Sequence, residues 1–218
     1  MGIGHMGVAL AAKRAAPGAS LGALFLAAEL LDLLWPFFLL AGLEHVRITP
    51  GWMLLSPLDF YDYPISHSLA TVLGWSLALG IVYYTVRRDL RAAWIIGLAV
   101  SSHWVLDAVV HRPDLPLAPG SGVYVGFGLW NSRAATTVVE GAIFVAGAAL
   151  YLRSTAARDG AGRYGLWTLL ALCLILGAGT WIGQPPPPSV HALAVTALGL
   201  WLFVPWTSWV DRHRRPAG

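Results

Sequence analysis

The chain has 218 residues, of which 57% are hydrophobic and only 11% are charged, whereas a soluble domain carries about 25% charged residues. So few charges cannot cover the surface of a soluble protein of this length, which indicates an integral membrane protein. The formal net charge is +3, and the sequence contains no recognisable nucleic-acid-binding module or Gly-rich phosphate loop.

The segment before the first long apolar run, MGIGHMGVALAA, is too short to cross a membrane. Its basic residues, Lys13 and Arg14, follow the apolar stretch, which is the wrong order for a cleavable signal sequence. A half-helix that rises from these two residues would carry His5 about 12 Å into the bilayer. Pro17 and Gly18 would then supply the turn back. The alternative is an amphipathic helix that lies on the inner leaflet.

Six further segments are long enough to cross a membrane core, which takes about 20 apolar residues in a helix. In chain order they lie near residues 20–43, 66–86, 92–110, 134–153, 165–184 and 190–210. Charged or Pro-rich stretches separate them, such as RRDLR at 87–91 and PPPP at 185–188. We therefore expect an all-α fold, in which residues 1–218 form a single polytopic membrane helix bundle of six transmembrane helices plus the N-terminal half-helix.

The basic residues are distributed unequally between the two sides of this bundle. With the amino terminus inside, the inner side holds Lys13, Arg14, Arg87, Arg88, Arg91, Arg153, Arg158, Arg163, Arg212, Arg214 and Arg215. The outer loops hold only Arg47, Arg112 and Arg133. Because cytoplasmic loops carry the excess of Lys and Arg, we expect a multi-pass protein with both termini in the cytoplasm.

The third predicted span contains the motif SSHWVLDAVVH at 101–111, in which His103, Asp107 and His111 follow one another at steps of four. Residues spaced in this way share one face of a helix. Ionisable residues inside a membrane are costly and usually face the bundle interior, where they are paired or bind an ion. Alternatively, His103 and Asp107 form a buried hydrogen-bonded pair without metal, and His111 is an interfacial residue.

Other segments place ionisable residues in the same half of the membrane as this motif. These residues are His5 on the half-helix, Glu29 and Asp32 in the first span, His67 at the start of the second and Glu140 in the fourth. A helical rise of about 1.5 Å per residue and a core about 30 Å thick put them between the midplane and the outer edge. Independent structural roles would scatter such residues through both halves, so we expect them to meet.

Imidazole nitrogens and carboxylate oxygens are suitable ligands for a divalent cation such as zinc, which also neutralises neighbouring carboxylates. We expect one or two ions, with ligands among His5, Asp32, His67, His103 and Asp107. Candidates for proton transfer or for orienting these ligands are Asp62, His111 and Glu140. Glu29 could instead pair with the half-helix, and Glu140 with Arg133 or with a histidine.

The loop before the second span reads SPLDFYDYPISHS and ends at the predicted helix start. Ser66 or Ser68 could cap this helix. We expect Asp59 and Asp62 to face solvent. Alternatively, they could accept a hydrogen bond from His67, the kind of support that metal-bound histidines usually have.

These motifs resemble a family of membrane-bound, metal-dependent hydrolases that includes the LexA-binding inner-membrane protein. The family pattern has an early His, an acidic motif in the first long helix, Thr/Ser-His-Ser at a helix start and a later Ser-His-x-x-x-Asp. The matching residues are His5, Asp32 in AELLD, His67 in ISHS, and His103 with Asp107 in SSHWVLD. The resemblance covers residues 1–120, and the remainder, 121–218, looks like a subfamily feature of bacterial membrane proteins. The acidic motif departs from the family's Pro-Asp-x-Asp, because Glu29 and Asp32 are three residues apart and the Pro is missing.

The resemblance implies a metal-dependent hydrolase of the bacterial inner (plasma) membrane. A more remote resemblance, to the zinc-dependent phospholipase C and nuclease group, implies hydrolysis of phosphate esters. A site in the outer half of the membrane suits a lipid or lipid-linked phosphate, so membrane lipids are the expected partners and nucleic acid is not. Two alternatives stay open: a transporter or metal-binding channel, since such residues often mark ion paths, and a structural membrane protein without catalysis.

Overall fold

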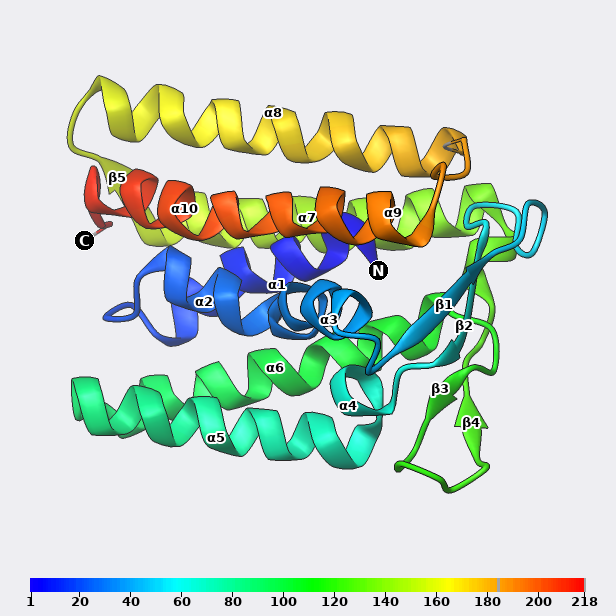
Figure 1. The fold of residues 1–218 in the computed structure, drawn as a ribbon. Coiled ribbons are helices and arrows are strands. Elements are labelled where there is room, and N and C mark those ends of the chain that lie inside the picture. Colours follow the sequence, from blue (N-terminus) through cyan, green and yellow to red (C-terminus); the bar gives the residue numbers. More distant parts are fainter. Residues whose placement is uncertain (184, 218) are drawn as a thin grey trace.

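The computed structural model describes residues 1–183 and 185–217, which form a helix bundle with short strand pairs at its two ends (Figure 1). The helices are α1 (Gly2–Ala15), α2 (Leu21–Ala28), α3 (Leu30–Leu40), α4 (Pro64–His67), α5 (Leu69–Arg87), α6 (Leu90–Val110), α7 (Arg133–Ser154), α8 (Gly160–Ile182), α9 (Val190–Ala197) and α10 (Phe203–Arg212). Two 3-10 helices, η1 (Leu129–Asn131) and η2 (Leu198–Leu202), complete them.

Five helices in the described ranges are long and apolar enough to cross a membrane, counting the run from α9 to α10 as one. The bent pair α2–α3 raises this number to six. The chain is therefore an all-α polytopic membrane protein, as the sequence predicts. The predicted fifth span ends at Gln184, which lies outside the described residues, and α8 covers Gly160–Ile182.

The first predicted span differs from the structure, because it is two helices rather than one. α2 and α3 meet at Glu29 and are bent by 56°. Glu29 ends α2 and begins α3, and its backbone angles, φ −105° and ψ 8°, are not helical. The break leaves the carbonyl group of Ala28 available to a side chain from another helix.

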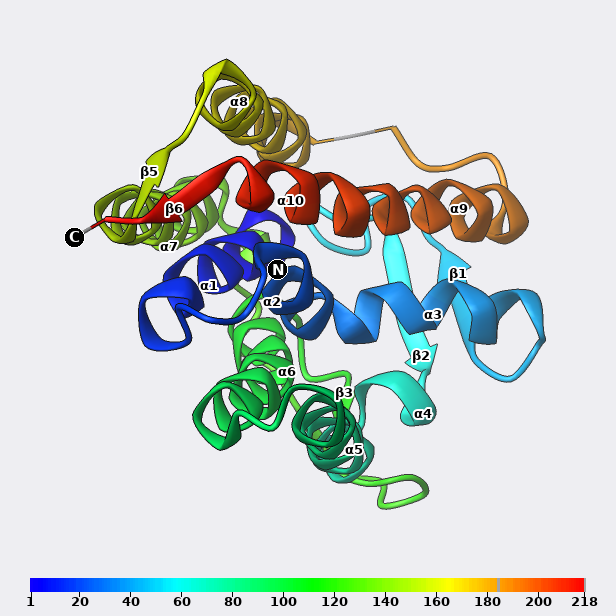
Figure 2. The same cartoon turned by 90° about the vertical axis from the view of Figure 1, so that its left-hand side faces the viewer.

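α1 lies at the centre of the bundle, where it contacts α2, α6, α7 and α8 (Figure 2). It packs on α7 at glycines: a Cβ atom on Gly7 would lie 2.7 Å from the carbonyl oxygen of Ile143, and one on Gly147 would clash with the backbone of Gly7. Small residues allow two helix backbones to approach this closely. The prediction of a half-helix inside the bundle is confirmed, and the alternative of a helix on the membrane surface is wrong.

One end of the bundle, which we call the basic end, carries the loops at 13–20, 87–91, 153–163 and 212–215 (Figure 1). Here Lys13 Nζ donates to Asp211 Oδ2 and to the carbonyl oxygen of Ala19, both at 2.7 Å. The hydroxyl group of Tyr151 donates to Asp211 Oδ1 at 2.8 Å. Strands β5 (Thr155–Ala157) and β6 (Arg214–Pro216) pair antiparallel beside this network. These contacts fix the turn that returns the chain from α1 into α2.

The opposite end, which we call the cap end, is covered by two antiparallel strand pairs that the sequence analysis did not predict. β1 (His45–Ile48) pairs with β2 (Leu58–Asp62), and β3 (Leu115–Pro116) pairs with β4 (Tyr124–Val125). The guanidinium group of Arg112 lies 4.1 Å from the ring centroid of Trp52. Together with α4 and η1, these strands close the cap end over the centre of the bundle (Figure 1).

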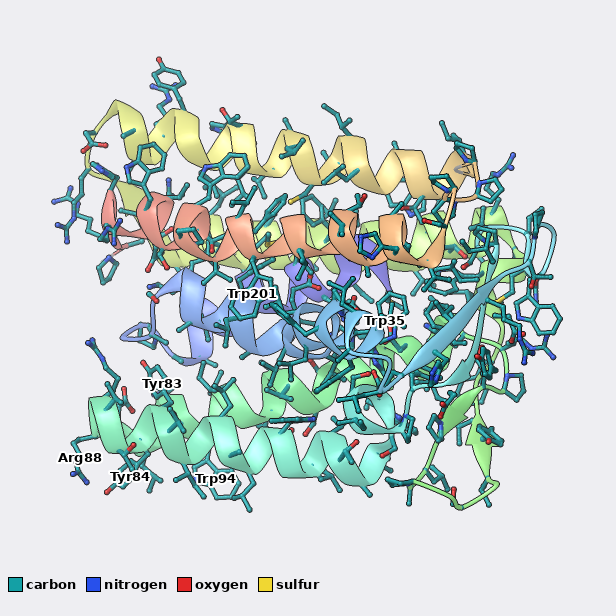
Figure 3. The ribbon with its side chains drawn as sticks, in the orientation of Figure 1. Trp35, Tyr83, Tyr84, Arg88, Trp94 and Trp201 are labelled. Atoms are coloured by element: carbon teal, nitrogen blue, oxygen red, sulfur yellow. The ribbon has the colours of Figure 1, made fainter. Side chains whose placement is uncertain are left out.

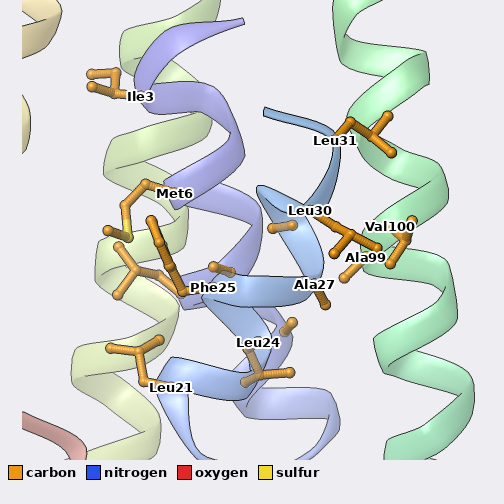
Figure 4. Packing of buried hydrophobic residues seen from close by; sticks show 14 of the residues in the cluster. Ile3, Met6, Leu21, Leu24, Phe25, Ala27, Leu30, Leu31, Ala99 and Val100 are labelled. Atoms are coloured by element: carbon orange, nitrogen blue, oxygen red, sulfur yellow. The ribbon is translucent and has the colours of Figure 1, made fainter. Parts of the chain in front are cut away.

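Apolar side chains fill the bundle between these two ends. Figure 4 shows part of this core, with Ile3, Met6, Leu21, Leu24, Phe25, Ala27, Leu30, Leu31, Ala99 and Val100 labelled. By contrast, α5 and the outer side of α6 expose large apolar groups, including Leu77 and Trp94. Figure 3 shows Trp94 and Tyr84 on the outside of this helical hairpin. An apolar outer surface of this kind is what a bilayer requires.

Replacing Gly147 by Ala should destabilise the fold, because the added methyl group meets the backbone of α1. We expect a loss of about 1–3 kcal/mol, which is typical of overpacking. The measurement is the midpoint of thermal unfolding in detergent. Gly74→Ala is the matched control, because a Cβ atom there meets no atom within 4 Å and Ala favours the helix by about 1 kcal/mol. Equal midpoints for the two variants would contradict the close packing of α1 on α7.

Candidate metal centre

The structure brings together the five side chains predicted as metal ligands. They come from four helices and form two overlapping groups: His5, Asp32 and His103, and His67, His103 and Asp107. Within each group the potential ligand atoms lie within 4.8 Å of one another. We call these five residues the His/Asp cluster.

Asp107 is at the centre of the cluster. Its Oδ1 lies 3.1 Å from His5 Nε2, and its Oδ2 lies 3.1 Å from His103 Nε2 and 3.7 Å from His67 Nε2. The rings of His5 and His103 stack, with centroids 3.7 Å apart. The carboxylate of Asp32 lies 3.5 Å from His67 Nε2 and 3.7 Å from His103 Nε2. Three imidazole rings therefore present Nε2 atoms to two carboxylates.

Local structure explains how each residue arrives at this point. His103 and Asp107 are one helical turn apart on α6, and Asp32 lies in the first turn of α3, just after the break at Glu29. His67 is the last residue of α4, before Ser68 leaves the helix with extended backbone angles. His5 reaches the centre because α1 enters the bundle from the basic end.

The backbone nitrogen of Met1 also lies at the cluster, beside Asp107 and 2.9 Å from His5 Nε2. A carboxylate buried in an apolar bundle needs a positive partner, so the position of Asp107 suits a cation.

The tautomer of His103 follows from its contact with the helix break. Its Nδ1 lies 2.7 Å from the carbonyl oxygen of Ala28, which can only accept, so Nδ1 carries the hydrogen. Nε2 faces Asp107 Oδ2 at 3.1 Å. In a neutral ring Nε2 presents a lone pair there, and a cation bound by both atoms fits this geometry. In a protonated ring Nε2 donates to the carboxylate, which is the metal-free pair that the sequence also allows.

His67 is oriented in the same way, by Ser66 and Glu44. Ser66 Oγ donates to Glu44 Oε2 at 2.6 Å, so His67 Nδ1, 2.7 Å from Ser66 Oγ, is the donor to that oxygen. Glu44 also accepts from the backbone N–H groups of Ile65 and Ser66, both at 2.7 Å. Nε2 of His67 is thereby directed at the carboxylates of Asp32 and Asp107. Such partners fix the orientation and raise the basicity of metal-binding histidines.

The contact of Glu44 with Ser66 was not predicted from the sequence, and Ser66 was considered only as a possible helix cap. Ser68, not Ser66, caps α5 by accepting from the backbone N–H group of Thr71. Glu44 lies beyond the predicted polar stripes, in a loop whose path depends on the strand pairing. A single acidic residue next to a span carries no signal that it will be buried.

The alternative that Asp59 and Asp62 orient His67 is wrong. Asp62 lies opposite His45 in the β1–β2 register and accepts from His45 Nδ1 at 2.7 Å. Its side chain is 44% exposed. Asp59 pairs instead with Arg47 at 3.6 Å. The pairing of β1 with β2 thus holds both carboxylates in the exposed hairpin, away from the cluster.

His111 ends α6 at the cap end and lies outside the two groups of candidate ligands. Its Nδ1 lies 3.0 Å from Asp114 Oδ1, and its ring packs on Trp130. Asp114 also accepts from the hydroxyl group of Tyr63 at 3.1 Å. Burial raises the pKa of Tyr63 well above its usual value, and the Asp114 carboxylate acts in the same direction. The hydroxyl group therefore stays protonated and serves as a donor.

Glu140 is fully buried on α7, beside the start of α1. A Cβ atom on Gly2 would lie 3.2 Å from Glu140 Oε2. The expected partner Arg133 donates instead to the carbonyl oxygen of Ile182. Neither carboxylate oxygen of Glu140 has a hydrogen-bond partner among the described residues, and Glu140 lies outside the two groups of candidate ligands.

A cavity of about 200 Å³ leads to the cluster from one side. It reaches the cluster at Asp32, whose side chain is 40% exposed while the other four cluster residues are buried. Glu29 lines the same cavity. The cluster is therefore enclosed on most sides and accessible from one.

Comparisons with protein-family models, with curated proteins and with solved structures returned no match for this chain.

Replacing Ser66 by Ala should weaken zinc binding about 10–100-fold, because His67 loses the acceptor that fixes its ring. The measurement is competition with a chromophoric chelator, using purified protein. Ser68→Ala is the control: it removes the cap of α5 and costs about 1 kcal/mol of stability without touching the cluster. Equal zinc affinities in the two variants would show that Ser66 does not support the site.

Proposed function

We propose that this protein is a membrane-embedded, metal-dependent hydrolase that acts on the phosphate ester of a lipid or lipid-linked substrate. The observation that carries the proposal is the His/Asp cluster, in which contacts outside the cluster turn the Nε2 atoms of His67 and His103 towards Asp107 and Asp32. A mixture of imidazole and carboxylate ligands suits zinc, as one or two ions.

The position of each residue suggests its role in the proposed reaction. His5, His67, His103, Asp32 and Asp107 would hold the metal. When bound, such an ion polarises the scissile bond and lowers the pKa of a water molecule. The burial of four of these side chains excludes bulk water, which strengthens every electrostatic interaction at the site.

Glu29 is the best-placed group for proton transfer. It lies on the cavity wall with Asp32. A carboxylate within reach of a bound substrate can accept and return a proton. His111 is less suited, because Asp114 engages its Nδ1 and the aromatic residues of the cap surround its ring.

The location of the protein follows from the same features. The eleven basic residues predicted on the inner side belong to the loops and helix ends of the basic end, and Lys and Arg mark cytoplasmic loops. We infer that the basic end, which carries the strand β6, is cytoplasmic, and that the cluster lies in the outer half of the inner membrane. The resemblance of the motifs to membrane-bound hydrolases supports the same assignment. Met1 departs from the predicted cytoplasmic position, because it is buried at the cluster.

The packing between the cluster and the basic end disfavours a transporter. An ion path would need polar groups along this route. The described residues there include Leu21, Leu24 and Phe25, which are buried apolar side chains (Figure 4). Leu10 is buried as well. The polar groups of the His/Asp cluster lie on the cap side of this apolar layer, and the Lys13–Asp211 network lies on its other side.

Purified protein should contain at least about one zinc ion per chain, and His103→Ala and Asp107→Asn should each lose it. Elemental analysis measures the content, and circular dichroism checks that the variants remain helical. Asp62→Asn is the control, since Asp62 lies in the exposed β1–β2 hairpin and its loss should leave the metal in place. Variants that keep the full zinc content would overturn the assignment of the ligands.

The same three variants should separate hydrolysis from mere binding. We expect phosphate release from phosphatidic acid or from polyprenyl pyrophosphate, abolished by a chelator and by His103→Ala but retained in Asp62→Asn. A metal-loaded protein that is inactive on the whole panel of lipid phosphates would contradict the proposed hydrolysis.

A further inference from the structure

The cavity beside the cluster has one polar wall and several apolar ones. Glu29 and Asp32 form the polar wall, at the junction of α2 and α3. The remaining lining comes from α1, α2, α8, η2 and α10: Gly2, Ile3, Met6, Phe25, Cys173, Leu176, Gly177, Thr180, Leu200 and Phe203. A cavity with this distribution matches a molecule that has a charged end and a hydrocarbon end.

The cavity lies where α8 separates from the helices that follow it. Near the basic end α8 and α10 are in close contact, since a Cβ atom on Gly165 would lie 2.8 Å from the ring of Trp209. Towards the cap end α8 and α9 diverge, as Figure 2 shows. Leu176 lines the cavity but is 48% exposed, so it marks the mouth of the cavity on the outer, apolar surface of the bundle.

We propose that a lipid substrate enters sideways from the bilayer through this mouth, between α8 and η2. Its phosphate headgroup would lie against the cation held by the cluster, on the side of Asp32, and the adjoining part of one hydrocarbon chain would lie against Leu176, Leu200 and Phe203. The inference rests on the proposed function and names the substrate class as a membrane lipid with a phosphate headgroup.

Size and position favour a lipid over a water-soluble phosphate ester. About 200 Å³ holds a headgroup and the start of one chain, so the rest of the chain must continue through the mouth into the bilayer. The mouth lies beside Leu176 of α8, a helix that is long and apolar enough to span the membrane. A water-soluble ester would have to cross hydrocarbon to reach it, which is unfavourable for a charged group.

Leu176→Trp tests the route, because a larger ring at the mouth should obstruct the chain. The probe is a phosphatidic acid with a diazirine group in one acyl chain, photolysed in liposomes that contain the zinc-loaded protein. We expect labelling of residues 173–180 and 200–203, reduced about tenfold by the substitution. Hydrolysis of long-chain phosphatidic acid should fall by a similar factor.

Ile175→Trp is the matched control, since Ile175 is exposed on the same helix but does not line the cavity. It should leave labelling and hydrolysis unchanged. Leu200→Trp, on the opposite wall, should reproduce the loss and replaces Leu176→Trp if that variant does not fold. Zinc content should stay at the wild-type level in all three variants, which separates loss of the route from loss of the metal centre.

Labelling spread evenly over the lipid-facing helices and insensitive to Leu176→Trp and Leu200→Trp would overturn the route. So would a wild-type protein that hydrolyses p-nitrophenyl phosphate but not phosphatidic acid, since the substrate would then be water-soluble. The first result leaves the proposed lipid hydrolase intact. The second removes its lipid substrate as well and leaves only a metal-dependent phosphatase. Absence of zinc and of all phosphatase activity would instead refute the hydrolase and the route with it.

Discussion

The arrangement of this bundle depends on a single carboxylate, that of Asp107, which is 2% exposed in the interior of a membrane protein. A charge in this position is tolerated only when it is paired or binds a cation. The unusual features of the fold deliver partners to it. α1 brings His5, α4 ends with His67, and α6 itself supplies His103 one turn away. The half-helix α1 and the short helix α4 therefore both place a potential partner beside the buried carboxylate of Asp107.

Two interruptions in the helices also set the chemistry of the ligands. The break at Glu29 frees the carbonyl oxygen of Ala28, which accepts from His103. The break between α4 and α5 leaves Ser66 beside His67, where Glu44 holds it. An unbroken α2–α3 helix would have used the carbonyl oxygen of Ala28 internally, whereas the contact at His67 is made by the Ser66 side chain. Local departures from regular helix thus decide which nitrogen of each imidazole faces the cluster.

The parts of the site that the sequence predicts are those governed by helix geometry. The pairing of His103 with Asp107 follows from their spacing, and the approach of His5 follows from the rise of a half-helix. The partner of His67 could not be predicted in this way. Asp62 is nearer in the chain than Glu44, but the register of β1 with β2 places it opposite His45. Strand register and the bend at Glu29 arise from tertiary packing, which local spacing does not encode.

The position of α1 links the metal centre to the route proposed for the substrate. Gly7 and Gly147 let α1 approach α7 so closely that it occupies the centre of the bundle. Its first turn then lies at the meeting point of three features, because Gly2 faces Glu140, His5 joins the cluster and Ile3 lines the cavity. α8 packs against the same turn, since a Cβ atom on Gly177 would clash with Ile3. A shift of α1 along α7 would therefore change the ligand position of His5 and the shape of the cavity together, so the close helix packing controls both.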